Sequence, residues 1–152
     1  MNLNQYTTKS QEAIQKAQQI AMEFGNQSIE PQHLLEGIFQ VDENISAFLM
    51  KKSEADLSLI REKNRENLEN LPKVQGGNIY LSQSANKVLL DAPNVAKKMG
   101  DEFVTIFLFM VKSLLKMLLE TVRWLNFLNH INQQTIHSHD KMTLAKLLIP
   151  QT

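Results

Sequence analysis

Apolar residues recur at spacings of three and four along much of the chain, which is the pattern of helices that bury one face. The first such run covers 7–24 and includes Ala13 and Ala17. Thr7 stands at its start, where a hydroxyl oxygen accepts from first-turn amides, and Gly25 follows its end, where a left-handed residue stops a helix. The pattern therefore predicts an amphipathic helix over 7–24.

The same pattern returns 75 residues further along the chain, over 82–99. Three pairs of positions share the N-cap hydroxyl, an apolar site and the terminal glycine: Thr7 and Ser82, Ala17 and Ala92, Gly25 and Gly100. We infer an internal repeat. An interior proline usually kinks a helix, so Pro93 predicts a bent rather than a broken helix. Its apolar stripe is expected to lie mostly in the core: Val88, Leu89, Ala92, Val95, Ala96 and Met99.

Further helices are predicted after the first glycine, over 29–40, 44–52 and 56–70. Pro31 suits the first turn of the helix over 29–40, because a residue there needs no amide partner. The charged helix over 56–70 is expected to turn one face inward, with Leu57, Ile60, Asn64, Leu68 and Leu71. No strand pattern competes with these helices.

The fold class that follows is all-α, with two tandem four-helix repeats in a single domain over 1–152. Its expected parts are a first repeat over about 4–72, a linker over 72–80, a second repeat over about 81–130 and an atypical tail over 131–152. Pro72, Gly76 and Gly77 mark the linker. The apolar run after Ile106 keeps helical spacing, so we expect 106–120 to be helical and packed, and residues from about 130 on to be loosely held.

Composition narrows the possible partners. The 16 basic and 16 acidic residues cancel, so no positive excess favours nucleic acid. The absence of cysteine excludes disulfides and thiolate metal sites, and it suits a reducing cytoplasm. The N-terminus lacks the pattern of a signal peptide, and the apolar stretch 103–111 is shorter than the roughly 20 residues of a membrane-spanning helix. We therefore expect a cytoplasmic chain without nucleic-acid or membrane partners.

Catalytic motifs are absent from the sequence. It contains no phosphate-binding loop and no common nucleophile or zinc signature, so we expect no enzyme activity, no cofactor and no metal. His33 is interpreted as a residue that packs and hydrogen-bonds near a helix start. The cluster of His137, His139 and Asp140, with His130 upstream, is interpreted as a solvated polar tail. A metal-dependent hydrolase that uses these histidines stays as an alternative.

Five segments carry a family resemblance: Tyr6-Thr7 through Ala17, Ile29-Glu30-Pro31-Gln32-His33-Leu34-Leu35-Glu36-Gly37, Leu71-Pro72-Lys73-Val74 with Gly76-Gly77, Tyr80-Leu81-Ser82 and Gly100-Asp101-Glu102-Phe103-Val104. In order and spacing they resemble the Clp N-terminal domain of ClpB-type AAA+ disaggregase chaperones over about 1–106. Beyond Ile106 the resemblance ends, because Phe107 stands where that family has an acidic residue. One hypothesis is that residues from about 107 onward are read out of frame or come from an altered gene end. Translating the coding DNA in the other frames tests this hypothesis.

The resemblance implies a domain that engages unfolded or aggregated polypeptide in a shallow apolar groove and delivers it to the ATPase domains of a hexameric parent chaperone. Its groove and polar anchors correspond here to Thr7, Val95, Asp101 and Leu108. Thr7 is equally an N-cap, and Asp101 is equally a cap for the next helix. Substrate binding is expected to suffer from the loss of the acidic anchor at Phe107. The alternative within the same class is a domain on which a folded adaptor protein docks.

Overall fold

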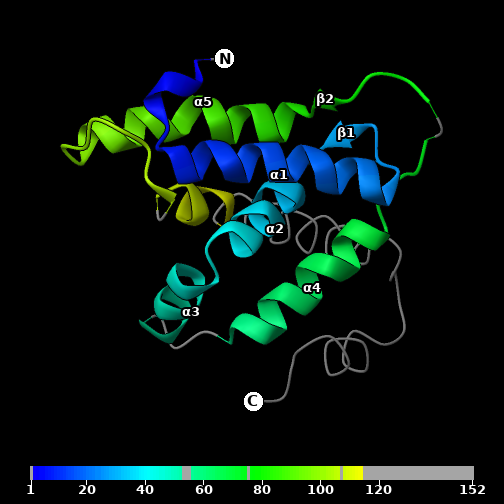
Figure 1. The fold of residues 1–152 in the computed structure, drawn as a ribbon, viewed down its shortest axis with the longest axis horizontal. Coiled ribbons are helices and arrows are strands. Elements are labelled where there is room, and N and C mark those ends of the chain that lie inside the picture. The colour runs from blue at the N-terminus through cyan, green and yellow to red at the C-terminus, as the bar shows by residue number, and fades with distance from the viewer. Residues whose placement is uncertain (1, 53–55, 75, 107, 115–152) are drawn as a thin grey trace, which may run out of the picture. The chain divides into compact units, whose positions relative to one another are not determined.

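Helices make up most of the described chain (Figure 1). The structure is a computed structural model that describes residues 2–52, 56–74, 76–106 and 108–114, which lie in a unit over 1–117. Its elements are a 3-10 helix (Leu3–Gln5), α1 (Thr8–Phe24), β1 (Ser28–Ile29), α2 (Pro31–Val41), α3 (Glu43–Lys52), α4 (Leu57–Glu69), β2 (Tyr80–Leu81) and α5 (Gln83–Lys98). Residues 106 and 108–114 are helical as well.

The two long helices begin as the sequence predicts. The Thr7 hydroxyl oxygen accepts from the Ser10 amide at the start of α1, and the Ser82 hydroxyl oxygen accepts from the Ala85 amide at the start of α5. The donor-to-acceptor distances are 3.4 and 3.0 Å. Each bond satisfies a first-turn amide that has no partner within its own helix.

The same two helices also end alike. The Asn26 N–H donates to the Ala21 carbonyl at 2.8 Å, and the Asp101 N–H donates to the Ala96 carbonyl at 2.9 Å. In both cases the preceding glycine has positive φ, 71° at Gly25 and 84° at Gly100. This backbone arrangement needs a left-handed residue, which glycine adopts without strain. The matched beginnings and ends confirm the internal repeat.

Two short backbone pairings join the repeats, and no strand was expected. Strand β1 pairs in parallel with β2, placing Ile29 opposite Leu81, and Tyr6 forms an isolated parallel bridge with Val104. Ile29 and Val104 are 75 positions apart, as are Tyr6 and Leu81. The two pairings are therefore equivalent: in each, the segment that follows the long helix of one repeat pairs with the segment that precedes the long helix of the other. The end of α1 meets the start of α5 and the end of α5 meets the start of α1, so the helices run antiparallel in Figure 1.

Helix α2 packs against α1 and also contacts α5. Its approach to α1 is close at Gly37, where a Cβ atom would lie 2.4 Å from the Ala13 carbonyl oxygen and 3.0 Å from the Ala17 nitrogen. Glycine and the two alanines thus allow nearly backbone-to-backbone contact between the helices. Buried apolar side chains from α2 and α5 continue the core on either side, among them Leu34, Leu35, Ile38, Phe39, Val88 and Leu89.

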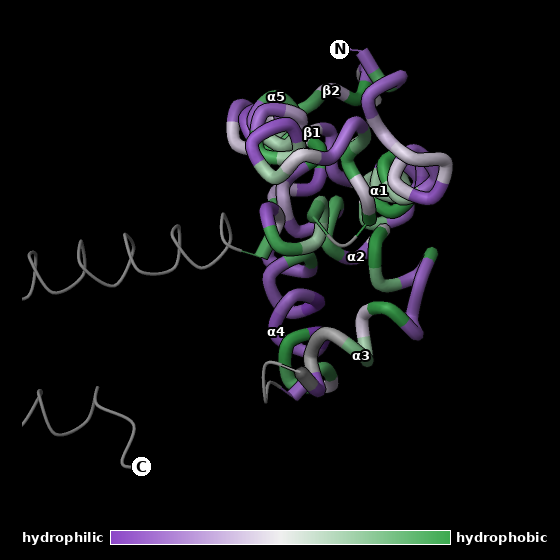
Figure 2. The backbone as a smooth tube through the Cα atoms, turned by 90° about the vertical axis from the view of Figure 1, so that its left-hand side faces the viewer, coloured by the Kyte–Doolittle hydropathy of each residue, from purple (hydrophilic) through white to green (hydrophobic). Residues whose placement is uncertain are grey.

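Helix α4 buries part of its predicted face. In α4 the Asp56 carboxylate caps the start, and Asn64 and Leu68 are buried, while much of the helix is hydrophilic (Figure 2). Asp42 precedes α3 and accepts from the Ile45 amide and from Lys9. The hydrogen bond from Lys9 holds the pKa of the Asp42 carboxyl below its usual range. Within the described residues no helix is both long and apolar enough to span a membrane.

The chain continues through Pro93 in one helix, as expected. The helical residues that follow are packed, since Ile106, Leu108, Phe109 and Met110 are buried. This confirms the predicted packed helix as far as residue 114. The predictions for 115–120 and for the tail over 131–152 lie outside the described residues.

Substituting Gly37→Ala is expected to destabilise the domain by about 1–3 kcal/mol, because the added methyl group must separate α1 from α2. The gain in helix propensity, about 1 kcal/mol, opposes this effect but is smaller than a clash with backbone atoms. Chemical denaturation measures the change. Asn67→Ala, at an exposed position of α4, is the control and should leave the unfolding midpoint nearly unchanged. An unaltered midpoint for Gly37→Ala would contradict the close approach.

Candidate functional site

Three of the four candidate site residues lie along the segments that meet at the Tyr6–Val104 bridge, and the fourth, Val95, lies within α5. Thr7 is next to Tyr6, and its N–H donates to the Val104 carbonyl at 3.1 Å. Asp101 belongs to the turn that leads from α5 to Val104, and Leu108 belongs to the helix that follows it. The fold thus brings the start of the first repeat and the middle of the second together.

Buried polar groups hold this junction in place. The Ser10 hydroxyl donates to the Val104 carbonyl at 2.9 Å and lies 2.9 Å from the Thr7 hydroxyl. The Tyr6 hydroxyl donates to the Leu89 carbonyl at 2.6 Å, and its ring meets Phe109 edge-on with centroids 5.8 Å apart. Burial raises the pKa of Tyr6, so it stays a neutral donor. Thr7 therefore has a structural role as an N-cap within a satisfied network.

Asp101 is exposed and does not cap the next helix. Thr105 caps it instead, because the Leu108 amide donates to the Thr105 hydroxyl oxygen at 3.4 Å and the Phe109 amide donates to its carbonyl at 3.0 Å. The interpretation of Asp101 as that cap is therefore wrong. Asp101 and the neighbouring Glu102 present two carboxylates to solvent.

Apolar side chains are exposed on both sides of these carboxylates. Met99 is 61% exposed and Phe103 is 44% exposed. Val95, which is half-buried against the core, precedes Met99 by one helical turn and so shares its face. Placing Met99 in the core was thus a wrong prediction, although Val88, Leu89, Ala92 and Ala96 of the same stripe are buried. Val95, Met99 and Phe103 form what we call the α5-end patch.

Leu108 lies in the core and not on this surface. It is 4% exposed and belongs to the main core with Phe109 and Val104, so in this conformation its side chain has almost no surface for a ligand. Met99 and Phe103 were not predicted as site residues. The sequence feature that could have identified them is their position on either side of Gly100, Asp101 and Glu102. These residues are typical of an exposed turn, and the side chains next to such a turn also reach solvent.

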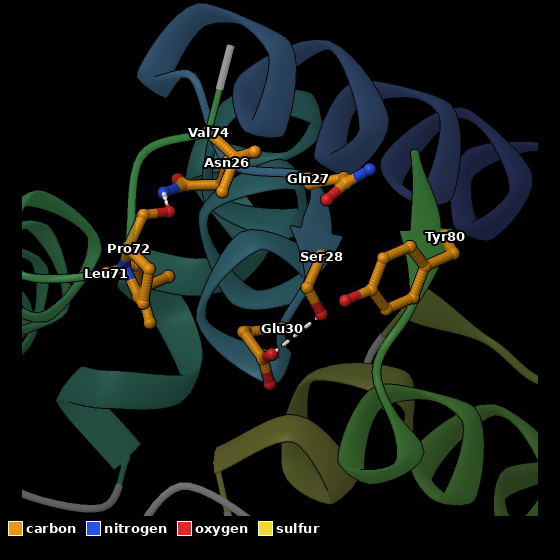
Figure 3. Close-up of a pocket in the computed structure, with 8 residues that line it drawn as sticks. All are labelled: Asn26, Gln27, Ser28, Glu30, Leu71, Pro72, Val74 and Tyr80. Atoms are coloured by element: carbon orange, nitrogen blue, oxygen red, sulfur yellow. Dashed lines mark hydrogen bonds between the residues drawn. The ribbon is translucent and has the colours of Figure 1, made fainter. Parts of the chain in front are cut away.

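The corresponding turn of the first repeat is covered by the linker (Figure 3). The Asn26 side-chain amide donates to the Pro72 carbonyl at 3.0 Å, and the Val74 N–H donates to the Gly25 carbonyl at 2.9 Å. A pocket of about 270 Å³ remains beside the linker and is lined by Asn26, Gln27, Ser28, Glu30, Leu71, Pro72, Val74 and Tyr80. The Ser28 hydroxyl donates to the Glu30 carboxylate at 2.8 Å inside it.

His33 connects this turn to the start of α2. Its Nδ1 accepts from the Glu30 N–H at 2.9 Å, so its Nε2 carries the proton and donates to the Asn26 side-chain oxygen at 3.0 Å. The ring is fully buried, and burial lowers its pKa to about 4. This confirms the interpretation of His33 as a packed, hydrogen-bonded residue near a helix start.

Metal ligands do not gather in the part of the chain that the structure describes, where no group of three or more acidic or histidine side chains is placed to hold an ion. The cluster of His130, His137, His139 and Asp140 lies outside the described residues, and so does Phe107. What the described site offers is a surface of apolar side chains, carboxylates and backbone groups, all of which can contact a ligand.

The repeat, its reciprocal bridges and this surface define a known class of domain. The family model of the Clp repeat (R) N-terminal domain matches residues 5–116, beyond the point at which the sequence resemblance ends. The chain therefore belongs to the Clp N-terminal domain family.

Particular relatives agree with this assignment. The chaperone protein ClpB of Bacteroides thetaiotaomicron is 43% identical over 109 residues, and that of Porphyromonas gingivalis is 41% identical over 106 residues. Both alignments cover 70% of this chain and 12% of the relative, so the chain spans a small part of the proteins it matches.

Solved structures confirm the all-helical fold class. The Hsp104 N-terminal domain from Candida albicans superposes with a TM-score of 0.68, covering 77% of this chain and 78% of that chain at 18% identity. The ClpD N-terminal domain from Arabidopsis thaliana gives a TM-score of 0.58, covering 74% and 77% at 21% identity.

The His33 network predicts a loss of stability in acid. The unfolded chain protonates His33 near pH 6.5 but the folded chain only near pH 4. The stabilisation that depends on neutral His33 is therefore fully present above pH 6.5. As the pH drops from 6.5 toward 4, the free energy of unfolding falls by up to about 1.4 kcal/mol per pH unit. Urea unfolding between pH 7.5 and 4.5 measures this slope, and His33→Gln should flatten it.

Parallel pH profiles for the unmodified chain and His33→Gln would contradict this prediction. If the variant does not fold, an NMR titration of the imidazole in the unmodified chain measures the same pKa directly. A midpoint near 6.5 in the folded chain would then be the contradicting result.

Proposed function

We propose that this domain engages unfolded or aggregated polypeptide at the α5-end patch and the polar groups beside it. The observation that carries the proposal is the exposure of Met99 and Phe103 around Asp101, at the junction where the two repeats meet. Membership of the Clp N-terminal domain family supports it, since the relatives are chaperone proteins. Of the residues expected from the sequence, Val95 belongs to this patch and Asp101 lies between Met99 and Phe103 in the chain. Thr7 is an N-cap at the junction, and Leu108 lies in the core.

The chemistry of the patch suits weak and varied binding. A flexible methionine and an aromatic ring adapt to different apolar segments, and exposed carboxylates add a polar anchor without a deep pocket. Low affinity is useful in a domain that must release what it binds. We further propose that the partner that receives the polypeptide is a set of ATPase domains, hexameric when the parent chaperone is full length.

The double variant Met99→Ser/Phe103→Ser is expected to weaken binding of unfolded casein by at least about tenfold. Removing two half-exposed apolar side chains forgoes burial worth about 1.4 kcal/mol or more. Fluorescence anisotropy of labelled, unfolded casein measures the affinity. Circular dichroism of the variant establishes that both mutations leave the fold intact.

A matched control comes from the first repeat. Met22→Ser/Tyr80→Ser removes two apolar side chains that are 57% and 56% exposed, away from the α5-end patch. It should leave casein binding within about twofold of the unmodified chain, a change of less than 0.5 kcal/mol at roughly 1.4 kcal/mol per tenfold. Equal losses in both double variants would indicate non-specific adhesion. Binding of a folded adaptor protein without any binding of casein would favour the docking alternative.

No ATP turnover is expected from the purified chain, because its sequence contains no phosphate-binding loop. A phosphate-release assay measures this against a preparation from cells that lack the expressed chain. Turnover that rises with the concentration of purified chain, and that is missing from the control preparation, would be incompatible with a binding module.

A further inference from the structure

The two repeats place different side chains at the same turn. Asn26 and Gln27 follow Gly25 at the end of α1, and Asp101 and Glu102 follow Gly100 at the end of α5. Both turns have the same backbone hydrogen bonds and a left-handed glycine. They are therefore two copies of one surface, with amides in the first and carboxylates in the second.

The first copy holds a segment of its own chain. The linker segment 71–74 lies against it without helix or strand structure (Figure 3). Two hydrogen bonds fix it, from the Asn26 amide to the Pro72 carbonyl at 3.0 Å and from the Val74 N–H to the Gly25 carbonyl at 2.9 Å. This surface thus binds a peptide through one side-chain donor and one backbone acceptor.

The second copy leaves the corresponding positions exposed to solvent. Gly100, Asp101 and Glu102 are exposed, and among the described residues none donates a hydrogen bond to the Gly100 carbonyl or to the Asp101 carboxylate. Met99 and Phe103 flank these residues with exposed apolar surface. A peptide lying here as the linker lies on the first copy would touch all of them.

The exchange of amide for carboxylate changes which peptide fits. An amide both donates and accepts, whereas an ionised carboxylate only accepts. Asn26 donates to a carbonyl of the linker, but Asp101 at the same position would repel that carbonyl. A ligand on the second copy must bring donors, and arginine and lysine side chains bring charged ones.

We propose that the second copy binds unfolded segments that carry arginine or lysine beside an aliphatic residue, in the place that the linker takes on the first copy. This rests on the proposed function and names the class of segment preferred. The cation lies on Asp101 and Glu102, the aliphatic residue packs on Met99 and Phe103, and a peptide N–H donates to the Gly100 carbonyl. Lys97 and Lys98 in the last turn of α5 reduce the local negative potential, so the preference is modest.

Three labelled peptides of equal length test the proposal on the whole chain, each with a central arginine, glutamine or glutamate between leucine and valine. The arginine peptide is expected to bind about 3- to 5-fold more tightly than the glutamine peptide, the effect of an exposed ion pair, and the glutamate peptide least. The difference should shrink at high salt. N-methylation of the leucine and valine amides should weaken binding, because the Gly100 carbonyl then loses its donor.

Asp101→Asn/Glu102→Gln restores the amides of the first copy, and it should abolish the arginine preference while keeping the affinity for the glutamine peptide. Glu12→Gln/Glu23→Gln removes the same charge from exposed positions of α1 and should keep the preference. Equal binding of all three peptides, or a preference that survives in Asp101→Asn/Glu102→Gln, overturns this inference while casein binding still supports the proposed function. Failure of casein and of every peptide to bind overturns both.

Discussion

The carbonyls of Ile29 and Val104 each accept from the backbone amide that begins the long helix of the other repeat. Val104 accepts from Thr7 at 3.1 Å, and Ile29 accepts from Ser82 at 3.0 Å. Because Thr7 and Ser82 are also the N-caps, one residue fixes both the start of a helix and its position against the other repeat. The antiparallel arrangement of α1 and α5, the burial of Tyr6 and the location of the exposed turn after α5 all depend on this exchange.

A shared backbone supports two different interiors. In the first repeat His33 forms a buried polar network and Gly37 allows α2 to touch α1. The positions 75 residues later hold Leu108 and Lys112, so the second repeat has neither the imidazole nor the glycine. Its helix after Thr105 instead contributes apolar side chains to the core. The polar network fastens the linker onto the first repeat, and the second repeat has no described counterpart to it.

The sequence predicts the helices well because their ends are chemically marked. Hydroxyl N-caps and terminal glycines located α1 and α5 to within a residue. The strands were missed because two-residue strands are too short to show any alternation of apolar and polar positions. The 75-residue repeat in the sequence reveals two copies of one unit. It does not reveal that the segment after the long helix of each copy pairs with the segment before the long helix of the other.

The candidate site was harder to predict, for local reasons. Helical periodicity placed Met99 on the buried stripe of α5, but the stripe reaches solvent in the last turn before Gly100. Aspartate and threonine are both favourable N-cap residues, so the sequence allows either Asp101 or Thr105. In the structure the helix begins after Thr105, which is therefore the cap. The position of Leu108 in the core follows from the packing of its helix against Tyr6 and Val104, which no local pattern encodes.

The hydrogen bond between the Ser10 hydroxyl and Val104 joins residues 94 positions apart in the chain. During synthesis on the ribosome, α1 is translated well before Val104, whose carbonyl accepts from Thr7 and Ser10 at the N-terminal end of that helix. Helix α1 therefore cannot reach its final environment by folding with its own repeat alone. Contacts of such long sequence separation close large loops and tend to slow folding. Thr7 and Ser10 can consequently acquire their Val104 partner only after the turn that follows α5 has been translated.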